Sequence, residues 1–311
     1  MIKSVHFTGF RSLKDVELRL GPMTVLVGPN ATGKSTVLRG LEPSFVKQDV
    51  AEYWQRDRER PLLRRIVTDE GQESLTGHRG GDEPWLQPLP PYRRQHLHLD
   101  LEALRRPNQV QSVGALSVSG SNLANLIASL PRRVQAELAT RFCRLVPVFS
   151  DVDVQPDPIA PGMHRVVLQD RWREEVWYEP VEVSDGSMLM LAFSVLPFQS
   201  RVGNILTIEE PEHGLHPYLL QQLVELLRGL ASGLGGTKPI QVVIATHSAE
   251  LLEHLRPDEV RFLSRNDDGS VLIEEAPVDD PQWKDVYDEY QRSLGSLWLS
   301  GNLGGVPGGA A

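Results

Sequence analysis

Three short apolar runs along this chain predict buried strands. They are residues 23–27 (Met-Thr-Val-Leu-Val), 205–208 (Ile-Leu-Thr-Ile) and 240–245 (Ile-Gln-Val-Val-Ile-Ala). Runs of this length that do not alternate with polar residues are typical of strands covered on both faces of a sheet. Each run leads into glycine or polar residues, and open parallel sheets bind ligands at the carboxyl ends of their strands. The pattern therefore predicts one ligand site built from three strand ends.

The first run leads into a phosphate-binding loop of the Walker A type. Its sequence is Gly28-Pro29-Asn30-Ala31-Thr32-Gly33-Lys34-Ser35, followed by Thr36. The glycines let backbone N–H groups turn inward, so the loop and the helix predicted over 34–41 form a nest for an anion. We expect Lys34 to reach the β- and γ-phosphates of ATP and Ser35 to hold Mg²⁺. A glycine-rich turn without a ligand is the alternative, which the strand before the loop and the helix after it disfavour.

The second run ends on two carboxylates, Glu209 and Glu210, before Pro211. Two carboxylates beside a phosphate loop repel each other unless a cation lies between them or one has another task. We assign Glu209 to the Mg²⁺ shell and Glu210 to orienting and deprotonating the attacking water. Glu212 and His216 follow, and we interpret them as polar residues at the start of an amphipathic helix in preference to a role in the site.

The third run delivers Thr246, His247 and Ser248 to the same edge of the sheet. A histidine at this position can bond a γ-phosphate or the attacking water, so we count His247 among the catalytic candidates with Glu210 and Lys34. A purely structural histidine is the alternative.

Together, these elements resemble the ABC-type ATPase heads of the RecF, SMC and OLD group. The resemblance rests on 28–36, Ser184-Asp185-Gly186, 208–212 with Leu215-His216-Pro217, and 245–248, and the opening residues 7–14 are also similar. It implies an α/β P-loop NTPase fold with a mixed β-sheet flanked by helices, an antiparallel β subdomain and a helical or irregular insertion. It also implies that Ser184, Asp185 and Gly186 cap ATP bound to a second copy, so that the chain forms a homodimer on ATP binding. Arg11 and Ser12 would lie near the phosphates or base.

The chain departs from the wider ABC pattern at two motifs. Its signature runs Val183-Ser184-Asp185-Gly186-Ser187 where transporters have Leu-Ser-Gly-Gly-Gln, and Glu209 stands where most ABC proteins have Asp. Both variants suit the OLD-like branch. Gln109 and Gln111 are candidates for a Q-loop, although ordinary loop glutamines are the preferred interpretation.

The order of the motifs predicts a split architecture. Residues 1–43 and 183–275 are expected to form the nucleotide-binding core, and 276–311 a C-terminal helix and a glycine-rich tail. Residues 44–182 are expected as an insertion, in which 107–146 is mostly helical. Alternating residues in 164–168 and 175–178 predict a small antiparallel sheet within it.

Composition limits the classes of partner. The net charge of −9 argues against a generally cationic surface that coats nucleic acid. Ten arginines between residues 50 and 106 are nevertheless a candidate DNA or RNA contact, with a salt-bridged surface as the preferred alternative. They are Arg56, Arg58, Arg60, Arg64, Arg65, Arg79, Arg93, Arg94, Arg105 and Arg106. No apolar run is long enough to cross a bilayer and the first residues lack a signal-peptide core, so a cytoplasmic protein without a membrane partner is expected.

The resemblance also bears on function. OLD nucleases carry a Toprim domain after the histidine motif, and 248–311 is too short for one. We therefore expect an ATP-hydrolysing motor or sensor of a DNA-directed repair or anti-phage defence system, with a separate Toprim-like nuclease or toxin as partner. A nucleotide-gated binding or scaffold protein with negligible turnover is the alternative. A transporter ATPase is disfavoured by the signature and by the Glu-Glu-Pro-Glu run.

Overall fold

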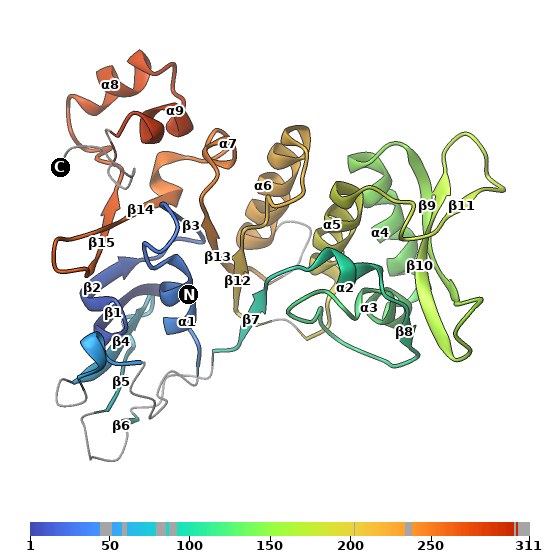
Figure 1. The fold of residues 1–311 in the computed structure, drawn as a ribbon, viewed down its shortest axis with the longest axis horizontal. Coiled ribbons are helices and arrows are strands. Elements are labelled where there is room, and N and C mark those ends of the chain that lie inside the picture. The colour runs from blue at the N-terminus through green and yellow to red at the C-terminus, as the bar shows by residue number, and fades with distance from the viewer. Residues whose placement is uncertain are drawn as a thin grey trace.

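The computed structural model describes residues 1–43, 52–57, 61–78, 85–86, 92–201, 203–233, 238–301 and 303. Within these residues the strands form three sheets (Figure 1). In the left half of the figure, the sheet that contains the N-terminal strand lies below a mixed sheet, which we call the middle sheet. A small antiparallel sheet lies at the right-hand end. Helices fill the space between the middle sheet and the small sheet.

The middle sheet is six-stranded and mixed, which confirms the predicted α/β class. Its order is β15-β14-β3-β13-β12-β7, and all neighbours are parallel except β15 with β14. The bounds are β3 Met23–Val27, β7 Arg94–Leu97, β12 Ile205–Glu209, β13 Gln241–Thr246, β14 Val260–Arg265 and β15 Val271–Glu275. The three strands predicted from apolar runs, β3, β13 and β12, are direct neighbours.

The two faces of this sheet bury different cores, which explains why its strands are apolar without alternation. Val25 and Val27 of β3 join the core shared with the helices, whereas Leu26 joins the core shared with the N-terminal sheet. In the same way, Val242 and Ile244 of β13 face one core, and Val243 and Ala245 face the other. A polar side chain on either face would therefore be desolvated.

The N-terminal sheet covers one face of the middle sheet together with α1 (Lys34–Gly40). It is antiparallel with the order β2-β1-β4-β5-β6. The bounds are β1 Ile2–Phe10, β2 Leu13–Arg19, β4 Leu62–Thr68, β5 Glu73–His78 and β6 Trp85–Leu86, and a 3₁₀ turn, η2 (Trp54–Arg56), precedes β4.

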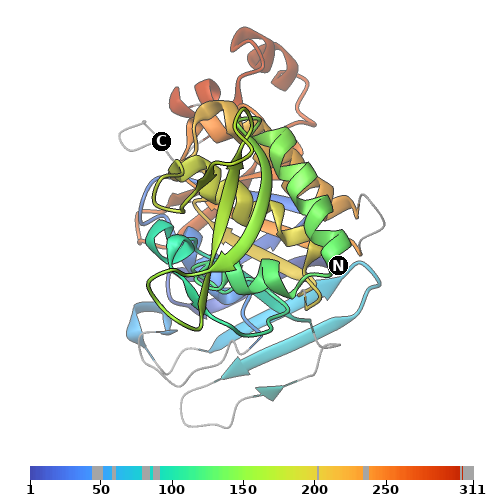
Figure 2. The same cartoon turned by 90° about the vertical axis from the view of Figure 1, so that its right-hand side faces the viewer.

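The other face is covered by helices, of which α5 (Asp185–Ser194) and α6 (Pro217–Ser232) are central (Figure 1). Beyond them lie α2 (Leu101–Arg105), α3 (Leu123–Ser129), α4 (Arg132–Leu145) and the small sheet of β8 (Asn108–Gln109), β9 (Phe149–Pro156), β10 (Met163–Asp170) and β11 (Trp177–Tyr178). Figure 2 shows the long β9 and β10 strands in front, with α4 beside them. The remaining elements are η3 (Leu196–Phe198), η4 (Pro257–Glu259), α7 (Ala249–Leu252), α8 (Trp283–Glu289) and α9 (Leu294–Leu299).

Residues 44–182, expected as one insertion, are divided among all three sheets. β4, β5 and β6 extend the N-terminal sheet, β7 is the edge strand of the middle sheet, and only the segment from about Leu101 onward builds the helical and antiparallel region. The described helices include none with both the length and the apolar character needed to cross a membrane.

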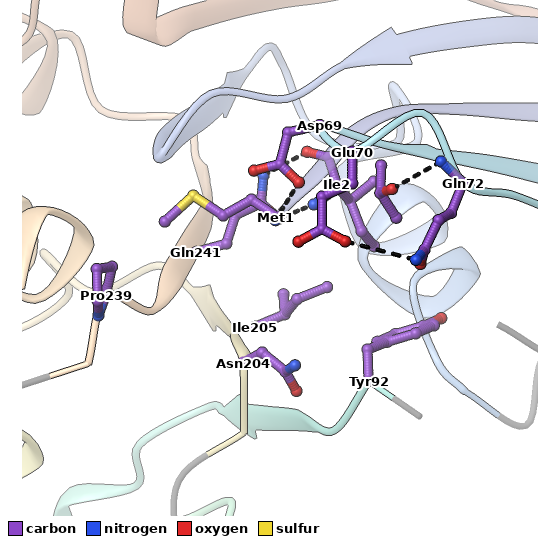
Figure 3. A pocket seen from close by; sticks show the side chains of 11 residues that line it. Met1, Ile2, Asp69, Glu70, Gln72, Tyr92, Asn204, Ile205, Pro239 and Gln241 are labelled. Carbon is purple, nitrogen blue, oxygen red and sulfur yellow. Dashed lines mark hydrogen bonds and ion pairs between the residues drawn. The ribbon is translucent and has the colours of Figure 1, made fainter. Parts of the chain in front are cut away.

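One side chain joins the N-terminal sheet to the middle sheet at the amino ends of their strands. The Gln241 amide accepts from the Ile2 N–H at 2.9 Å and donates to the carbonyls of Ile2 at 2.7 Å and Gly21 at 2.9 Å. A cavity of about 340 Å³ lies beside it, lined among others by Asp69, Tyr92 and Asn204 (Figure 3). Because Gln241 is the first residue of β13, this cavity lies at the opposite end of the strand from Thr246.

Candidate nucleotide-binding site

The phosphate loop spans 28–33, between β3 and α1, and it is packed against β14 and β15. A Cβ at Gly28 would lie 2.5 Å from the Leu263 carbonyl oxygen, and one at Gly33 would lie 2.6 Å from a Val271 methyl carbon. Gly33 also has a φ of +107°, which L side chains rarely adopt. Arg265, which sequence reasoning missed, donates to the Ala31 carbonyl at 3.0 and 2.6 Å. The loop is therefore fixed from outside as well as by its own glycines.

Lys34 lies inside this loop. Its ammonium donates to the carbonyls of Gly28 at 2.7 Å and Pro29 at 2.8 Å. Burial lowers the pKa of Lys34, and the carboxylates of Glu210, Glu212 and Glu209 act in the opposite direction. Of the other loop residues, Thr32 is buried, Asn30 and Ala31 are exposed, and Thr36 follows in α1.

Ser35 and Glu209 meet as the sequence predicts for a cation site. The Ser35 hydroxyl donates to Glu209 Oε2 at 3.0 Å, although 174 positions separate them in sequence. They come together because α1 begins at the end of β3 and Glu209 ends β12, two strands away in the parallel sheet. A hydroxyl and a carboxylate oxygen are donors that Mg²⁺ prefers.

Glu210 and His247 also meet, at the ends of β12 and β13. Glu210 Oε1 lies 3.0 Å from His247 Nδ1, and the Glu210 N–H donates to the Ala245 carbonyl at 2.8 Å. Glu210 has a φ of +46°, a strained backbone conformation for a residue with a side chain. The fold thus holds the carboxylate of Glu210 beside the imidazole of His247 at a backbone cost of order 1–3 kcal/mol.

Glu212 is not a polar residue at the start of a helix, as the sequence suggested. Its carboxyl group is buried and accepts from the Thr246 hydroxyl, while Glu212 Oε2 has no hydrogen-bond partner among the described residues. Burial raises the pKa of Glu212. His216 does fit the helical interpretation, since its Nδ1 caps α6 by accepting from Tyr218 N at 3.2 Å.

His96 is a residue of the site that sequence reasoning missed. It lies on β7, the edge strand beside β12, and its Nδ1 is 3.0 Å from Thr207 Oγ1. Its Nε2 lies 3.7 Å from Glu209 Oε1. Burial, followed by the charge of Arg94, lowers the pKa of His96. The four-residue strand has no apolar pattern that could have signalled its position.

The signature residues lie at the start of α5. Ser184 caps the helix by accepting from Ser187 N at 3.3 Å, and Asp185 pairs with Arg105 at 2.8 Å. Arg105 also donates to the Val183 carbonyl at 2.7 Å, so it holds the turn that precedes the helix. Ser184 and Asp185 are exposed, Gly186 is half-buried, and no hydrogen bond or ion pair among the described residues links the three to the phosphate loop.

Arg11 and Ser12 lie in the turn between β1 and β2 and differ in their contacts. Arg11 forms a bidentate pair with Glu52, with both distances 3.0 Å, so its guanidinium is held by a carboxylate. Ser12 Oγ is buried without a hydrogen-bond partner in the described part of the chain, and a Cβ at Gly33 would lie 3.4 Å from it. The position of Ser12 beside the loop therefore fits a phosphate ligand better than that of Arg11.

The two Q-loop candidates lie away from the site. Gln109 is in β8 of the small sheet and Gln111 follows it, so neither lies on the middle sheet. The arginines of 50–106 are mostly engaged within the chain: Arg64 is buried, and pairs join Arg65 with Glu73, Arg94 with Glu42, Arg105 with Asp185 and Arg106 with Glu102. Arg58, Arg60 and Arg79 fall outside the described residues. This favours the salt-bridged alternative for the cluster.

The residues present fit a nucleotide with a divalent cation. Lys34 supplies a buried ammonium, Ser12 supplies a hydroxyl without a partner among the described residues, and Ser35 with Glu209 supplies oxygen donors. Among the described residues, no group of three or more His, Cys, Asp or Glu side chains could hold a metal alone. Phosphate oxygens would therefore have to complete the coordination shell.

Comparison with known proteins finds two family models that match parts of this chain. Residues 1–64 match the family model described as "AAA ATPase domain", and residues 121–253 match the one described as "AAA domain, putative AbiEii toxin, Type IV TA system". A segment of 42 residues is 48% identical to an OLD nuclease of Thermus scotoductus (strain ATCC 700910 / SA-01). That segment is 14% of this chain and only 8% of the nuclease.

Solved SMC heads share the fold. The SMC head domain from Thermotoga maritima superposes with a TM-score of 0.55 and 15% identity, covering 88% of this chain and 98% of that one. An SMC head bound to the C-winged helix domain of ScpA superposes with a TM-score of 0.55 and 14% identity. This match covers 89% of this chain and 98% of that one. An SMC head from Pyrococcus furiosus, bound to the C-terminal domain of ScpA, superposes with a TM-score of 0.52 and 14% identity. This match covers 93% of this chain and 99% of that one. The chain therefore has the fold of these SMC heads, and parts of its sequence resemble two AAA ATPase family models and an OLD nuclease.

Proposed function

We propose that this chain binds ATP with Mg²⁺ and hydrolyses it in sites shared between two copies. The observation that carries the proposal is the convergence of Ser35 with Glu209 and of Glu210 with His247 at the carboxyl ends of neighbouring parallel strands. Strand ends of this kind are where open α/β sheets bind their ligands. The family models and the SMC-like fold support an ATPase at this position.

Each residue has a task that its contacts support. The loop N–H groups and Lys34 bind the β- and γ-phosphates, because the buried ammonium exchanges two carbonyl contacts for phosphate oxygens. Glu210 accepts the proton of the attacking water, and His247 orients the Glu210 carboxylate through the 3.0 Å contact. Mg²⁺, when bound, neutralises the charge that develops on the phosphate oxygens.

A second copy would complete each site. Ser184, Asp185 and Gly186 lie at the start of α5, and in the described part of the chain no hydrogen bond or ion pair joins them to their own phosphate loop. The N-terminus of that helix can cap phosphate groups brought to it by another molecule. We therefore assign the three residues to the ATP held by the partner copy.

We further propose that ATP-dependent pairing drives a DNA-directed repair or anti-phage defence system. A relative named as an OLD nuclease and a family described with a toxin support this assignment. The effector would be a separate Toprim-like nuclease or toxin, with DNA or RNA as its target. Metal-dependent cutting by the purified chain alone would contradict a separate effector.

A single-turnover experiment separates this function from the alternative, a nucleotide-gated scaffold with negligible turnover. Excess protein is mixed with radiolabelled ATP and Mg²⁺, and bound ATP and released phosphate are followed in the same sample. An ATPase converts its bound ATP within one cycle. A scaffold holds ATP without releasing phosphate, which would overturn the proposal.

The matched variant for this experiment is Glu210→Gln. The amide keeps the size of the side chain and can still contact His247, but it cannot take a proton from water. We expect unchanged binding of ATP and phosphate release slower by about 10²-fold or more, the usual cost of losing a general base. Near-normal turnover would remove Glu210 from this role.

A further inference from the structure

We propose that His96 supplies a nitrogen ligand to the cation held by Ser35 and Glu209, so that this site prefers Mn²⁺ or another first-row transition metal to Mg²⁺. The inference rests on the proposed function, because nucleotide oxygens must complete the coordination shell. It goes beyond that function by naming a ligand that sequence motifs do not contain and a metal class that motifs do not predict.

His96 lies close enough to Glu209 for both to bind one metal ion. His96 Nε2 lies 3.7 Å from Glu209 Oε1, and the other oxygen of the same carboxylate accepts from Ser35 at 3.0 Å. Two ligand atoms on one metal ion, each at about 2.1 Å, are at most about 4.2 Å apart. The separation between His96 and Glu209 is longer than a hydrogen bond but within this limit. One ion can therefore bind both side chains with only small movements.

The hydrogen bond between the His96 imidazole and Thr207 leaves the Nε2 lone pair directed toward Glu209. The Thr207 hydroxyl donates to the Gln95 carbonyl at 3.4 Å, which leaves the Thr207 oxygen to accept from His96 Nδ1–H at 3.0 Å. With its proton on Nδ1, a neutral imidazole presents a lone pair at Nε2. That lone pair faces a carboxylate oxygen, so two acceptors oppose each other. A cation between the two acceptors resolves this conflict. Metal-binding histidines usually donate their other ring N–H to a neighbouring group, as His96 does to Thr207.

The donor atoms of this site favour a transition metal. Mg²⁺ and Ca²⁺ take oxygen ligands, whereas imidazole nitrogen suits transition metals, whose affinities rise along the series from Mn²⁺ to Cu²⁺. A hydroxyl, a carboxylate and nucleotide phosphates alone would favour Mg²⁺. The addition of His96 shifts the preference toward a metal that accepts nitrogen.

A second histidine offers a matched control. His213 Nδ1 also lies 3.7 Å from a glutamate, but from Glu210 Oε2, and its side chain is 80% exposed. Among the described residues, no serine hydroxyl bonds to the Glu210 carboxylate and no threonine hydroxyl bonds to the His213 ring. Distance to a carboxylate is thus the same for both histidines, and only His96 is placed to share the cation of Ser35.

Pulsed electron paramagnetic resonance tests the proposal without measuring activity. The full chain is labelled with ¹⁵N-histidine and loaded with Mn²⁺ and a slowly hydrolysed ATP analogue. We expect ³¹P coupling from the phosphates together with ¹⁵N coupling from one imidazole. The nitrogen coupling should disappear in His96→Asn and persist in His213→Asn. Phosphorus coupling without imidazole coupling would overturn this inference alone, whereas loss of both would contradict the proposed function as well.

Metal affinities provide a second readout. His96→Asn can keep the contact with Thr207 but lacks an atom at the Nε2 position, whereas His96→Gln places an amide oxygen near that position. We expect His96→Asn to weaken Mn²⁺ binding to the nucleotide complex by about tenfold or more. Even the loss of a group that only supports a metal ligand typically weakens metal binding by this factor. In His96→Gln the ratio of Mn²⁺ to Mg²⁺ affinity should fall toward that of an all-oxygen site. An unchanged ratio in both folded variants, checked by circular dichroism, would overturn the inference.

Discussion

The carboxyl group of Glu212 is enclosed by the turn that follows β12. It accepts from the Thr246 hydroxyl at the end of β13, so it connects two strands that carry the candidate catalytic residues. Its second oxygen is buried without a partner among the described residues. A charged carboxylate is costly in such a place, so the folded protein favours the protonated acid.

This burial predicts how stability depends on pH. Burial raises the pKa of Glu212 above its ordinary value of 4.5, so between 4.5 and the raised value the folded state binds more protons than the unfolded state. The free energy of unfolding therefore falls as pH rises through that window, because the stabilising contribution of the protonated Glu212 is lost. Glu212→Gln keeps an acceptor for Thr246 and cannot ionise. We expect it to be as stable as the wild type near pH 4 and more stable at pH 8, measured by urea denaturation.

The control for this comparison is Glu174→Gln, at an exposed position. Its stability should follow that of the wild type at every pH. If the Glu212→Gln and wild-type profiles also ran parallel between pH 4 and pH 8, the carboxyl group of Glu212 would not titrate differently in the folded and unfolded states.

At the scale of elements, the edge strand β7 depends on a glycine that precedes its partner strand. Gly203 lies just before β12, and a Cβ there would be 2.2 Å from the Arg93 carbonyl oxygen and 2.9 Å from Gln95 N. These atoms belong to the backbone of the β7 segment and cannot rotate away. The same segment is held by the Ile205 N–H, which donates to the Arg93 carbonyl at 3.2 Å. Close approach at Gly203 thus determines where His96 lies.

We predict that Gly203→Ala displaces β7 from β12. Overpacking of this kind costs about 1–3 kcal/mol, which urea denaturation would measure. Gly21→Ala is the control, because its Cβ would meet only the Met23 carbonyl oxygen at 3.4 Å. Since β7 carries His96, Gly203→Ala should also weaken the imidazole coupling to bound Mn²⁺. Wild-type stability and coupling would show that β7 is not held by this contact.

The sequence predicted those parts of the site that lie in contiguous motifs. The phosphate loop, Glu209, Glu210 and His247 each follow a recognisable buried strand, and the parallel sheet brings those strand ends together. His96 could not be found in this way, because a four-residue edge strand is positioned by pairing with β12 across more than a hundred residues. The pairing of Asp185 with Arg105 and the burial of Glu212 likewise depend on tertiary contacts that no local pattern encodes.

At the scale of the whole molecule, the phosphate loop and the signature turn belong to different elements of the same core. The loop begins α1, between the N-terminal and middle sheets, and the signature turn begins α5, on the other face of the middle sheet (Figure 1). In a head-to-head pair each surface would meet the complementary one of the second copy. Two equivalent sites would then form in one symmetric contact.

Sedimentation of two variants tests this arrangement. Lys34→Ala should lose affinity for ATP, whereas Asp185→Arg should bind ATP but remain monomeric, because a bulky cation blocks the turn that must close over the nucleotide of the other copy. Mixed together, the variants could form a heterodimer with at most one site that keeps both Lys34 and a native signature. Asp185→Asn, which also loses the pair with Arg105 but adds no bulk, is the control. Wild-type protein that stays monomeric with saturating analogue and Mg²⁺ would contradict the shared-site arrangement.

Helix α5 has an implication for how this protein can diverge. Every residue from Ser187 to Ser194 is buried, so the helix has no solvent face on which substitutions are neutral. The more accessible turn before these residues, Ser184 to Gly186, is constrained in a different way, by its proposed contact with the nucleotide of a second copy. A deep mutational scan should separate the two constraints. Substitutions at the eight buried positions should lower stability, whereas substitutions of Asp185 should lower ATP-dependent pairing and leave stability close to that of the wild type.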